Sequence, residues 1–124
     1  MIAELIICVS LTVVDGDTVK CDGQNMRLLG GGIPFVSGID TPEIGSHAKC
    51  LKERKLALIA KRRLRELLAE KGLRVVLSGA VDKTEAHRPL VNIYRMNGEE
   101  IGKTLLREGF ARAWSPKRRN DWCG

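Results

Sequence analysis

Residues 4–29, ELIICVSLTVVDGDTVKCDGQNMRLL, decide the fold of this chain. Three runs rich in apolar and β-branched residues are separated by two Asp-Gly pairs, and such pairs are typical of tight hairpin turns. The runs are residues 4–14, 18–23 and 24–29, and the pairs stand at 15–16 and 22–23. The stretch therefore predicts three consecutive antiparallel strands.

Two helices and two further strands are expected after these three strands. A helix capped by Ser46 and ended by Gly72 carries leucines at helical spacing, and Gly109 ends a second helix. The expected elements are a helix at 48–71, strands at 73–81 and 89–96, and a helix at 99–108. This order predicts an α+β fold, a five-stranded OB-fold barrel plus two main α-helices. Residues 1–124 are expected to form this single domain.

The charge balance favours an anionic partner. The chain carries 21 Lys and Arg against 15 Asp and Glu, a net charge of +6. Nucleic acid is the first candidate and anionic lipid or polysaccharide the second, although a basic balance also serves solubility. No apolar run approaches the ~20 residues of a membrane span, so no membrane partner is expected. The apolar N-terminus is predicted to be a strand and not a signal peptide.

The four cysteines are an even count without a Cys-x-x-C pair. This pattern argues against a zinc site, and it favours disulfides and an exported, oxidising compartment over the cytosol. Four cysteines allow three pairings, and the sequence alone does not choose among them. The favoured pairs are Cys8–Cys21, across two strands, and Cys50–Cys123, between the main helix and the end of the chain.

Three carboxylates and two arginines are the candidate chemical groups. Turn chemistry explains Asp15-Gly16 and could explain the segment from Asp40 to Glu43, but it explains Asp17 less well, because Asp17 stands at the start of a strand. Together their oxygens suit a hard cation such as calcium. In a phosphodiester hydrolysis, Asp17 and Asp40 would hold the metal and Glu43 would take a proton from water. Arg27 and Arg88 would bind phosphate oxygens with paired hydrogen bonds.

Five motifs occur in order along the chain: VVDGDTVK, RLL, GIDTPE, HRPLVNIY and GKTLLREGFARA. As a set they resemble the staphylococcal nuclease (thermonuclease) family across nearly the whole sequence. The resemblance implies an OB-fold barrel and a calcium-dependent endonuclease. Such an enzyme would cleave single-stranded or denatured DNA and RNA and leave 3′-phosphates.

The resemblance also implies a role for each matching residue. Asp17 and Asp40 would be the carboxylate ligands of calcium, and Thr41 would offer its backbone carbonyl to the same ion. Glu43 would be the general base.

The remaining implied roles concern the phosphate. Arg27 resembles the first phosphate-binding arginine of the family, and Arg88 the second, which stabilises the transition state. His87 replaces the usual glycine before Arg88 and is a candidate phosphate contact. Lys117 and Arg118 in the C-terminal tail are candidate nucleic-acid contacts.

The sequence departs from the family pattern at two places. The family runs directly from its R-L-x-G motif into I-D-x-P-E, whereas here residues 30–38 intervene. We expect these residues to form a surface loop, with Phe35 and Val36 packed on the barrel and Arg27 still reaching the site. The alternative is that Phe35 takes the place just ahead of the Asp-x-Pro-Glu turn, so that the site loses this arginine. The connection before Arg88 also lacks the tyrosine that many relatives pack on the nucleotide.

Two functions therefore stay open. One is the calcium-dependent nuclease, and the other is a catalytically impaired OB-fold module that binds nucleic acid or another polyanion. Keeping Asp17, Asp40 and Glu43 favours the enzyme, because carboxylates repel an anionic ligand. The chain is expected to act as a monomer.

Overall fold

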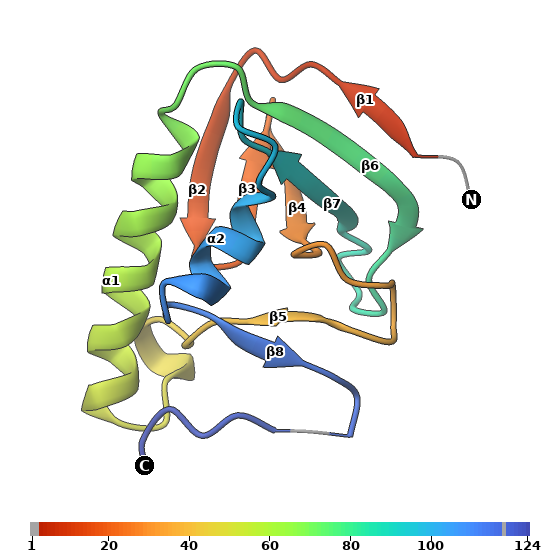
Figure 1. Cartoon of the computed structure of the whole chain (residues 1–124). Helices are drawn as coiled ribbons and strands as arrows, with labels where there is room; N and C mark the ends of the chain where they lie inside the picture. The colour runs from red at the N-terminus through yellow and green to blue at the C-terminus, as the bar shows by residue number, and fades with distance from the viewer. Residues whose placement is uncertain (1–2, 118) are drawn as a thin grey trace.

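The computed structural model describes residues 3–117 and 119–124, and within them the strands form one large and one small sheet (Figure 1). The large sheet has the order β1-β6-β7-β4-β3-β2. Its strands are β1 (Glu4–Ile6), β2 (Leu11–Asp15), β3 (Thr18–Cys21), β4 (Gln24–Leu28), β6 (Arg74–Val81) and β7 (Pro89–Tyr94). The small sheet pairs β5 (Gly38–Asp40) with β8 (Arg112–Trp114).

The large sheet has the connectivity expected of an OB-type barrel. Its two edge strands, β1 and β2, are consecutive in the chain and are separated only by residues 7–10. β1 pairs antiparallel with β6, β2 pairs antiparallel with β3, and β4 runs parallel to β7. If residues 4–15 are counted as one interrupted strand, five strands result. The predicted α+β fold with a five-stranded barrel arrangement and two main helices is thereby confirmed.

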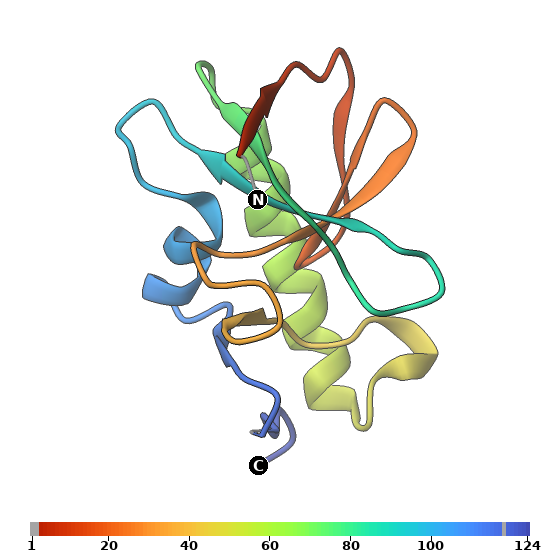
Figure 2. The ribbon, with the colours of Figure 1, turned by 90° about the vertical axis from the view of Figure 1, so that its right-hand side faces the viewer.

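Two α-helices and a short 3₁₀ helix complete the fold. They are α1 (Leu51–Leu68), α2 (Ile101–Arg107) and η1 (Gly45–His47). The long helix α1 lies beside β2 and runs behind the strands in the side view (Figure 2). Its side chains Leu64 and Leu67 are fully buried in one core with Val19, Val91 and Ile93 of the strands. The barrel interior is therefore closed on one side by α1.

The start of the main helix differs from the prediction. Ser46 lies in η1 and does not cap α1; the N-cap is Cys50, whose Sγ accepts a hydrogen bond from the Glu53 N–H at 3.4 Å. The buried Glu53 carboxylate also accepts the N–H groups of Lys49 (2.8 Å) and Glu43 (3.0 Å). The local bonds to Cys50 and Lys49 fix the first turn of the helix, and the contact with Glu43 and the disulfide of Cys50 hold it in place in the fold.

Both favoured disulfides are formed. Cys8 pairs with Cys21 beside the first hairpin, and Cys50 pairs with Cys123, which fixes the chain end to the N-terminus of α1. Two disulfides in a chain of this size indicate an oxidising environment. Among the described residues, none of the helices has the length and apolar character needed to cross a membrane.

The two disulfides should contribute unequally to stability. Cys50–Cys123 closes a separation of 73 residues and Cys8–Cys21 one of 13. Loop-closure entropy then assigns roughly 4 kcal/mol to the first and roughly 3 kcal/mol to the second. We expect Cys50→Ala/Cys123→Ala to lower the urea midpoint more than Cys8→Ala/Cys21→Ala does. An equal or opposite ranking would contradict this assignment.

Candidate active site

Arg27 reaches the first carboxylate of the candidate site. Its Nη1 lies 3.1 Å from Oδ2 of Asp17, and its Nη2 donates to the carbonyl of Ile39 at 3.1 Å. The hairpin register places Arg27 opposite Thr18, next to Asp17 in the chain. The inserted residues 30–38 therefore do not separate the arginine from the carboxylates. The alternative in which Phe35 takes that place and the site loses Arg27 is wrong.

The inserted loop leaves β4 and returns to β5 through tight glycine turns. Gly30 has a positive φ of +65°, and a Cβ there would lie 2.4 Å from Cγ2 of Ile39, so only glycine fits. The Gly31 N–H donates to Oδ1 of Asn92 on β7 at 2.8 Å. The N–H of Val36 donates to the carbonyl of Ile33 at 2.9 Å and closes the tip. The loop is thus anchored at its base and forms its own turn.

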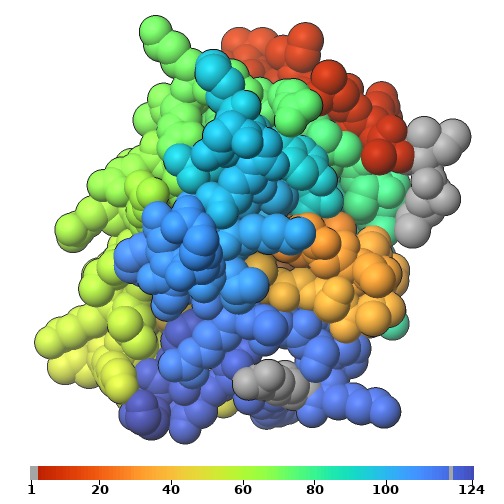
Figure 3. Space-filling model, in the orientation of Figure 1, coloured from red at the N-terminus to blue at the C-terminus, as the bar shows by residue number. Residues whose placement is uncertain are grey.

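The apolar side chains of this loop are more exposed than predicted. Phe35 is 41% exposed and Val36 is 56% exposed, so neither is packed into the barrel. The space-filling view shows this segment on the surface, above the C-terminal part of the chain (Figure 3). The expected surface loop is therefore present. Phe35 lies beside Leu90 in the wall of a pocket, whereas the predicted packing of Val36 on the barrel is wrong.

The two acidic motifs lie against each other. Gly16 and Thr41 are both buried, and a Cβ on Gly16 would lie 2.8 Å from Oγ1 of Thr41. The Asp-Gly-Asp turn therefore needs its glycine in order to approach the Asp-Thr-Pro-Glu segment. This contact brings Asp17 toward Asp40 and Glu43, two residues that line one pocket with Thr41.

Burial and mutual repulsion perturb these carboxyl groups. Burial, and after it the charge of Asp17, raises the pKa of Asp15 to about 7. Burial is also the main reason that the pKa of Asp40 is raised, and the charge of Asp17 adds to it. The pKa of Glu43 is raised first by burial and then by the charges of Asp17 and Asp40. A bound cation would relieve this repulsion.

The residues present fit a hard cation by their donor chemistry. Carboxylates of Asp17, Asp40 and Glu43 and the backbone carbonyl of Thr41 are the oxygen donors that calcium prefers. Among the described residues, however, no three Asp, Glu, His or Cys side chains converge closely enough to hold a metal ion as they stand. One oxygen of Asp17 is taken by Arg27.

Arg88 is held beside the same carboxylate by a chain of hydrogen bonds. Its Nε donates to Oδ2 of Asp82 at 2.6 Å, and its Nη1 donates to the Thr18 hydroxyl at 3.0 Å. The Thr18 hydroxyl in turn donates to Oδ1 of Asp17 at 3.1 Å. The two arginines therefore approach Asp17 from different elements, Arg27 from β4 and Arg88 from the loop before β7.

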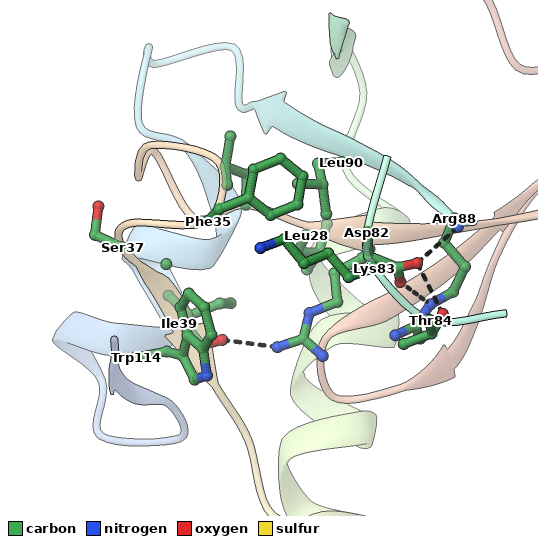
Figure 4. A pocket seen from close by; sticks show the side chains of 13 residues that line it. Leu28, Phe35, Ser37, Ile39, Asp82, Lys83, Thr84, Arg88, Leu90 and Trp114 are labelled. Carbon is green, nitrogen blue, oxygen red and sulfur yellow. Dashed lines mark hydrogen bonds and ion pairs between the residues drawn. The ribbon is translucent and has the colours of Figure 1, made fainter. Parts of the chain in front are cut away.

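A pocket of about 270 Å³ lies beside the two arginines. Its wall combines the charged groups of Arg27 and Arg88 with the apolar side chains of Leu90, Phe35 and Trp114 (Figure 4). Phe35 comes from the inserted loop, and its ring centroid lies 5.0 Å from Nζ of Lys83 in the loop opposite. The insertion thus forms one side of the pocket.

The remaining predicted contacts lie apart from this pocket. His87 is exposed, with a positive φ of 46°, and Lys117 is exposed in the tail. Neither lines the pocket beside the arginines. Arg118 lies outside the described residues.

Three further residues at the site were not found from the sequence. Thr18 follows Asp17 directly, so its position in the Asp-Gly-Asp-Thr motif was an available signal. Asp82, which holds Arg88, stands only six residues before it in the same loop, so the segment DKTEAHR carried an available signal. Asn120, which donates to Asp40, gave no local signal because Asp40 lies 80 residues away in the chain.

The comparison with protein families agrees with this geometry. A family model described as staphylococcal nuclease homologue matches residues 35–122, which is more than half of the chain. The chain therefore belongs to the staphylococcal nuclease homologue family, as the resemblance predicted. A search of curated proteins found no match. The matched part contains Asp40, Glu43 and Arg88, whereas Asp17 and Arg27 precede it and are placed at the site by the ion pair between them.

The raised pKa of Asp15 predicts a pH dependence of stability. A carboxyl whose pKa is 3.8 ordinarily and about 7 in the folded chain favours folding only while it is protonated. Its contribution is complete below about pH 4 and is lost as the pH rises through about 7. We expect Asp15→Asn to raise the free energy of unfolding at about pH 8 in EDTA by about 2 kcal/mol. This figure is smaller than the full pKa shift would give, because Asp15 is partly exposed and solvent screens its charge.

The same variant should bring no gain at about pH 4, where the native carboxyl is already protonated. Urea unfolding at both pH values measures the difference, and Glu4→Gln, at an exposed carboxyl on β1, is the control. Equal stabilisation at both pH values would contradict the assigned burial effect.

Proposed function

We propose that this protein is a calcium-dependent nuclease that hydrolyses phosphodiester bonds of DNA and RNA to 3′-phosphate products. One observation carries the proposal: Arg27 forms an ion pair with Asp17, and Arg88 reaches the same carboxylate through the Thr18 hydroxyl. Two arginines beside one pocket, joined through Asp17 to a carboxylate cluster that lines a second pocket, are the groups that a phosphoryl-transfer site requires. Membership of the staphylococcal nuclease homologue family supports the same chemistry.

In the proposed reaction, the two arginines stabilise negative charge and Glu43 transfers a proton. Arg27 and Arg88 bind the phosphate oxygens, where negative charge develops in the transition state. Glu43 is exposed to water and its raised pKa brings it closer to neutral pH, which suits a general base. The backbone hydrogen bond from the Glu43 N–H to the buried Glu53 fixes the segment that carries this base.

Asp17, Asp40 and the carbonyl of Thr41 are the proposed calcium ligands. When bound, calcium would supply positive charge for the phosphate and for an attacking water. Asp17 contributes its charge to both Arg27 and the cluster, so it links the phosphate-binding and metal-binding halves of the site.

The substrate is proposed to be single-stranded or denatured DNA and RNA. The pocket beside the arginines has room for a base, and Phe35 offers the aromatic face that the connection before Arg88 lacks. The net charge of +6 attracts the backbone, with His87, Lys117 and Arg118 as proposed outer contacts. The two disulfides support export to an oxidising compartment. The protein is proposed to act as a monomer.

A non-catalytic polyanion-binding module is the second candidate. The observation that favours it is the ion pair itself, because Arg27 occupies an oxygen of Asp17 that a metal would use. The two candidates differ in one assay. Incubation of the protein with single-stranded DNA in calcium, and then in EDTA, gives calcium-dependent cleavage for the enzyme and a shifted, uncut band for the module.

Removal of the proposed base or of an arginine should abolish most of the activity. We expect Glu43→Ala and Arg88→Ala each to lower kcat on denatured DNA by about two to four orders of magnitude, because each group acts on charge or protons in the transition state. Circular dichroism checks that the fold is intact. The matched controls are Glu4→Ala and Arg74→Ala, at exposed positions on β1 and β6. Unchanged hydrolysis by both variants would contradict the catalytic roles proposed for Glu43 and Arg88.

The inserted loop should contribute to substrate binding and not to the chemical step. Loss of one base–aromatic contact costs about 1–3 kcal/mol. We therefore expect Phe35→Ala to raise KM for single-stranded DNA by about fivefold to a hundredfold with kcat nearly unchanged. Ile33→Ala is the control, since Ile33 is exposed in the same loop but does not line the pocket. A fall in kcat at constant KM would assign the loop another role.

A further inference from the structure

The C-terminal segment, residues 119–124, lies directly against one proposed metal ligand. The side-chain amide of Asn120 donates to Oδ2 of Asp40 at 3.2 Å and to the carbonyl of Ala113 on β8 at 3.0 Å. One amide group therefore ties the carboxylate of β5 to the neighbouring strand. Because an NH₂ group has two hydrogens, it makes both bonds at once.

The segment is itself fixed by several contacts from other elements. The disulfide Cys50–Cys123 joins it to the N-cap of α1, and Nζ of Lys52 donates to the carbonyl of Gly124 at 2.8 Å. Trp122 is 6% exposed, and the guanidinium carbon of Arg112 lies 4.2 Å from its ring centroid. The position of Asn120 therefore depends on a covalent link and on a buried aromatic side chain.

The same segment forms a wall of the carboxylate site. Asn120 and Trp122 line a pocket of about 240 Å³ together with Asp40, Thr41 and Glu43. The pocket beside the arginines is lined by other parts of the chain, although both pockets include Trp114. The C-terminal segment thus meets the proposed metal ligands and not the proposed phosphate-binding groups.

We propose that Asn120 is a positioning residue for the cation site, and that the Cys50–Cys123 disulfide keeps it on Asp40. The inference rests on the proposed function in taking Asp40 as a cation ligand. Without the Asn120 amide, the Asp40 side chain regains rotamer freedom that must be lost again when a cation binds. Outer groups that orient a metal ligand typically change metal affinity by about tenfold to a hundredfold. Reduction of the disulfide acts in the same direction because the whole segment loses its anchor.

The test is calcium titration of the folded chain by calorimetry. We expect Asn120→Ala to weaken calcium binding by roughly tenfold, and Cys50→Ala/Cys123→Ala to weaken it at least as much. The matched controls are Asn25→Ala, an exposed asparagine on β4, and Cys8→Ala/Cys21→Ala, which removes the other disulfide. Both controls should bind calcium within about twofold of the natural chain. If the double-cysteine variant fails to fold, Asn120→Ala alone decides the proposal.

A second measurement separates positioning from a purely structural role. Cleavage of denatured DNA by Asn120→Ala should return to the natural rate when calcium is raised about tenfold, whereas Glu43→Ala should stay inactive. The inference is overturned if Asn120→Ala binds calcium as tightly as the unsubstituted chain does. It is also overturned if the unsubstituted chain binds no calcium. A natural chain that binds calcium and cuts no substrate overturns the proposed function, while the binding ratios still decide the inference.

Discussion

The ion pair between Arg27 and Asp17, 3.1 Å long, is the interaction on which the site depends. It is possible because the β3–β4 hairpin places Arg27 opposite Thr18, so its side chain falls beside the preceding aspartate. A slip of one residue in this register would turn the arginine to the other face of the sheet. The turn at Asp22-Gly23, which joins β3 to β4, therefore also determines which charged side chains meet at the site.

The carboxylate cluster is held together at an electrostatic cost. Burial raises the pKa of Asp40 and of Glu43, and repulsion from Asp17 adds to both. Packing holds the groups together in spite of this repulsion: Gly16 lies against Thr41 in a space that no larger residue would fit. A site that concentrates negative charge and sets arginines beside it is organised for a cation and a phosphate at once.

Two segments outside the β3–β4 hairpin line the two pockets of the site. The inserted residues 30–38 form their own turn, anchored to Asn92, and give the pocket an aromatic wall in Phe35. The C-terminal segment reaches Asp40 from the opposite end of the chain and is held by the disulfide Cys50–Cys123. Both segments form part of the surroundings of the site, and neither belongs to the β3–β4 hairpin.

Local patterns in the sequence predict the strands of the large sheet, the two main helices and the acidic and basic motifs, because Asp-Gly turns and apolar periodicity are local properties. They do not predict the small sheet of β5 and β8, whose strands pair across more than 70 residues of chain. Tertiary structure alone decided the rest. It showed that Arg27 reaches Asp17, and it moved the helix cap from Ser46 to Cys50. It also brought Asn120 onto Asp40, 80 residues away in the chain. The contact of Asn120 with Asp40 depends on how distant segments pack, and no local pattern of residues encodes it.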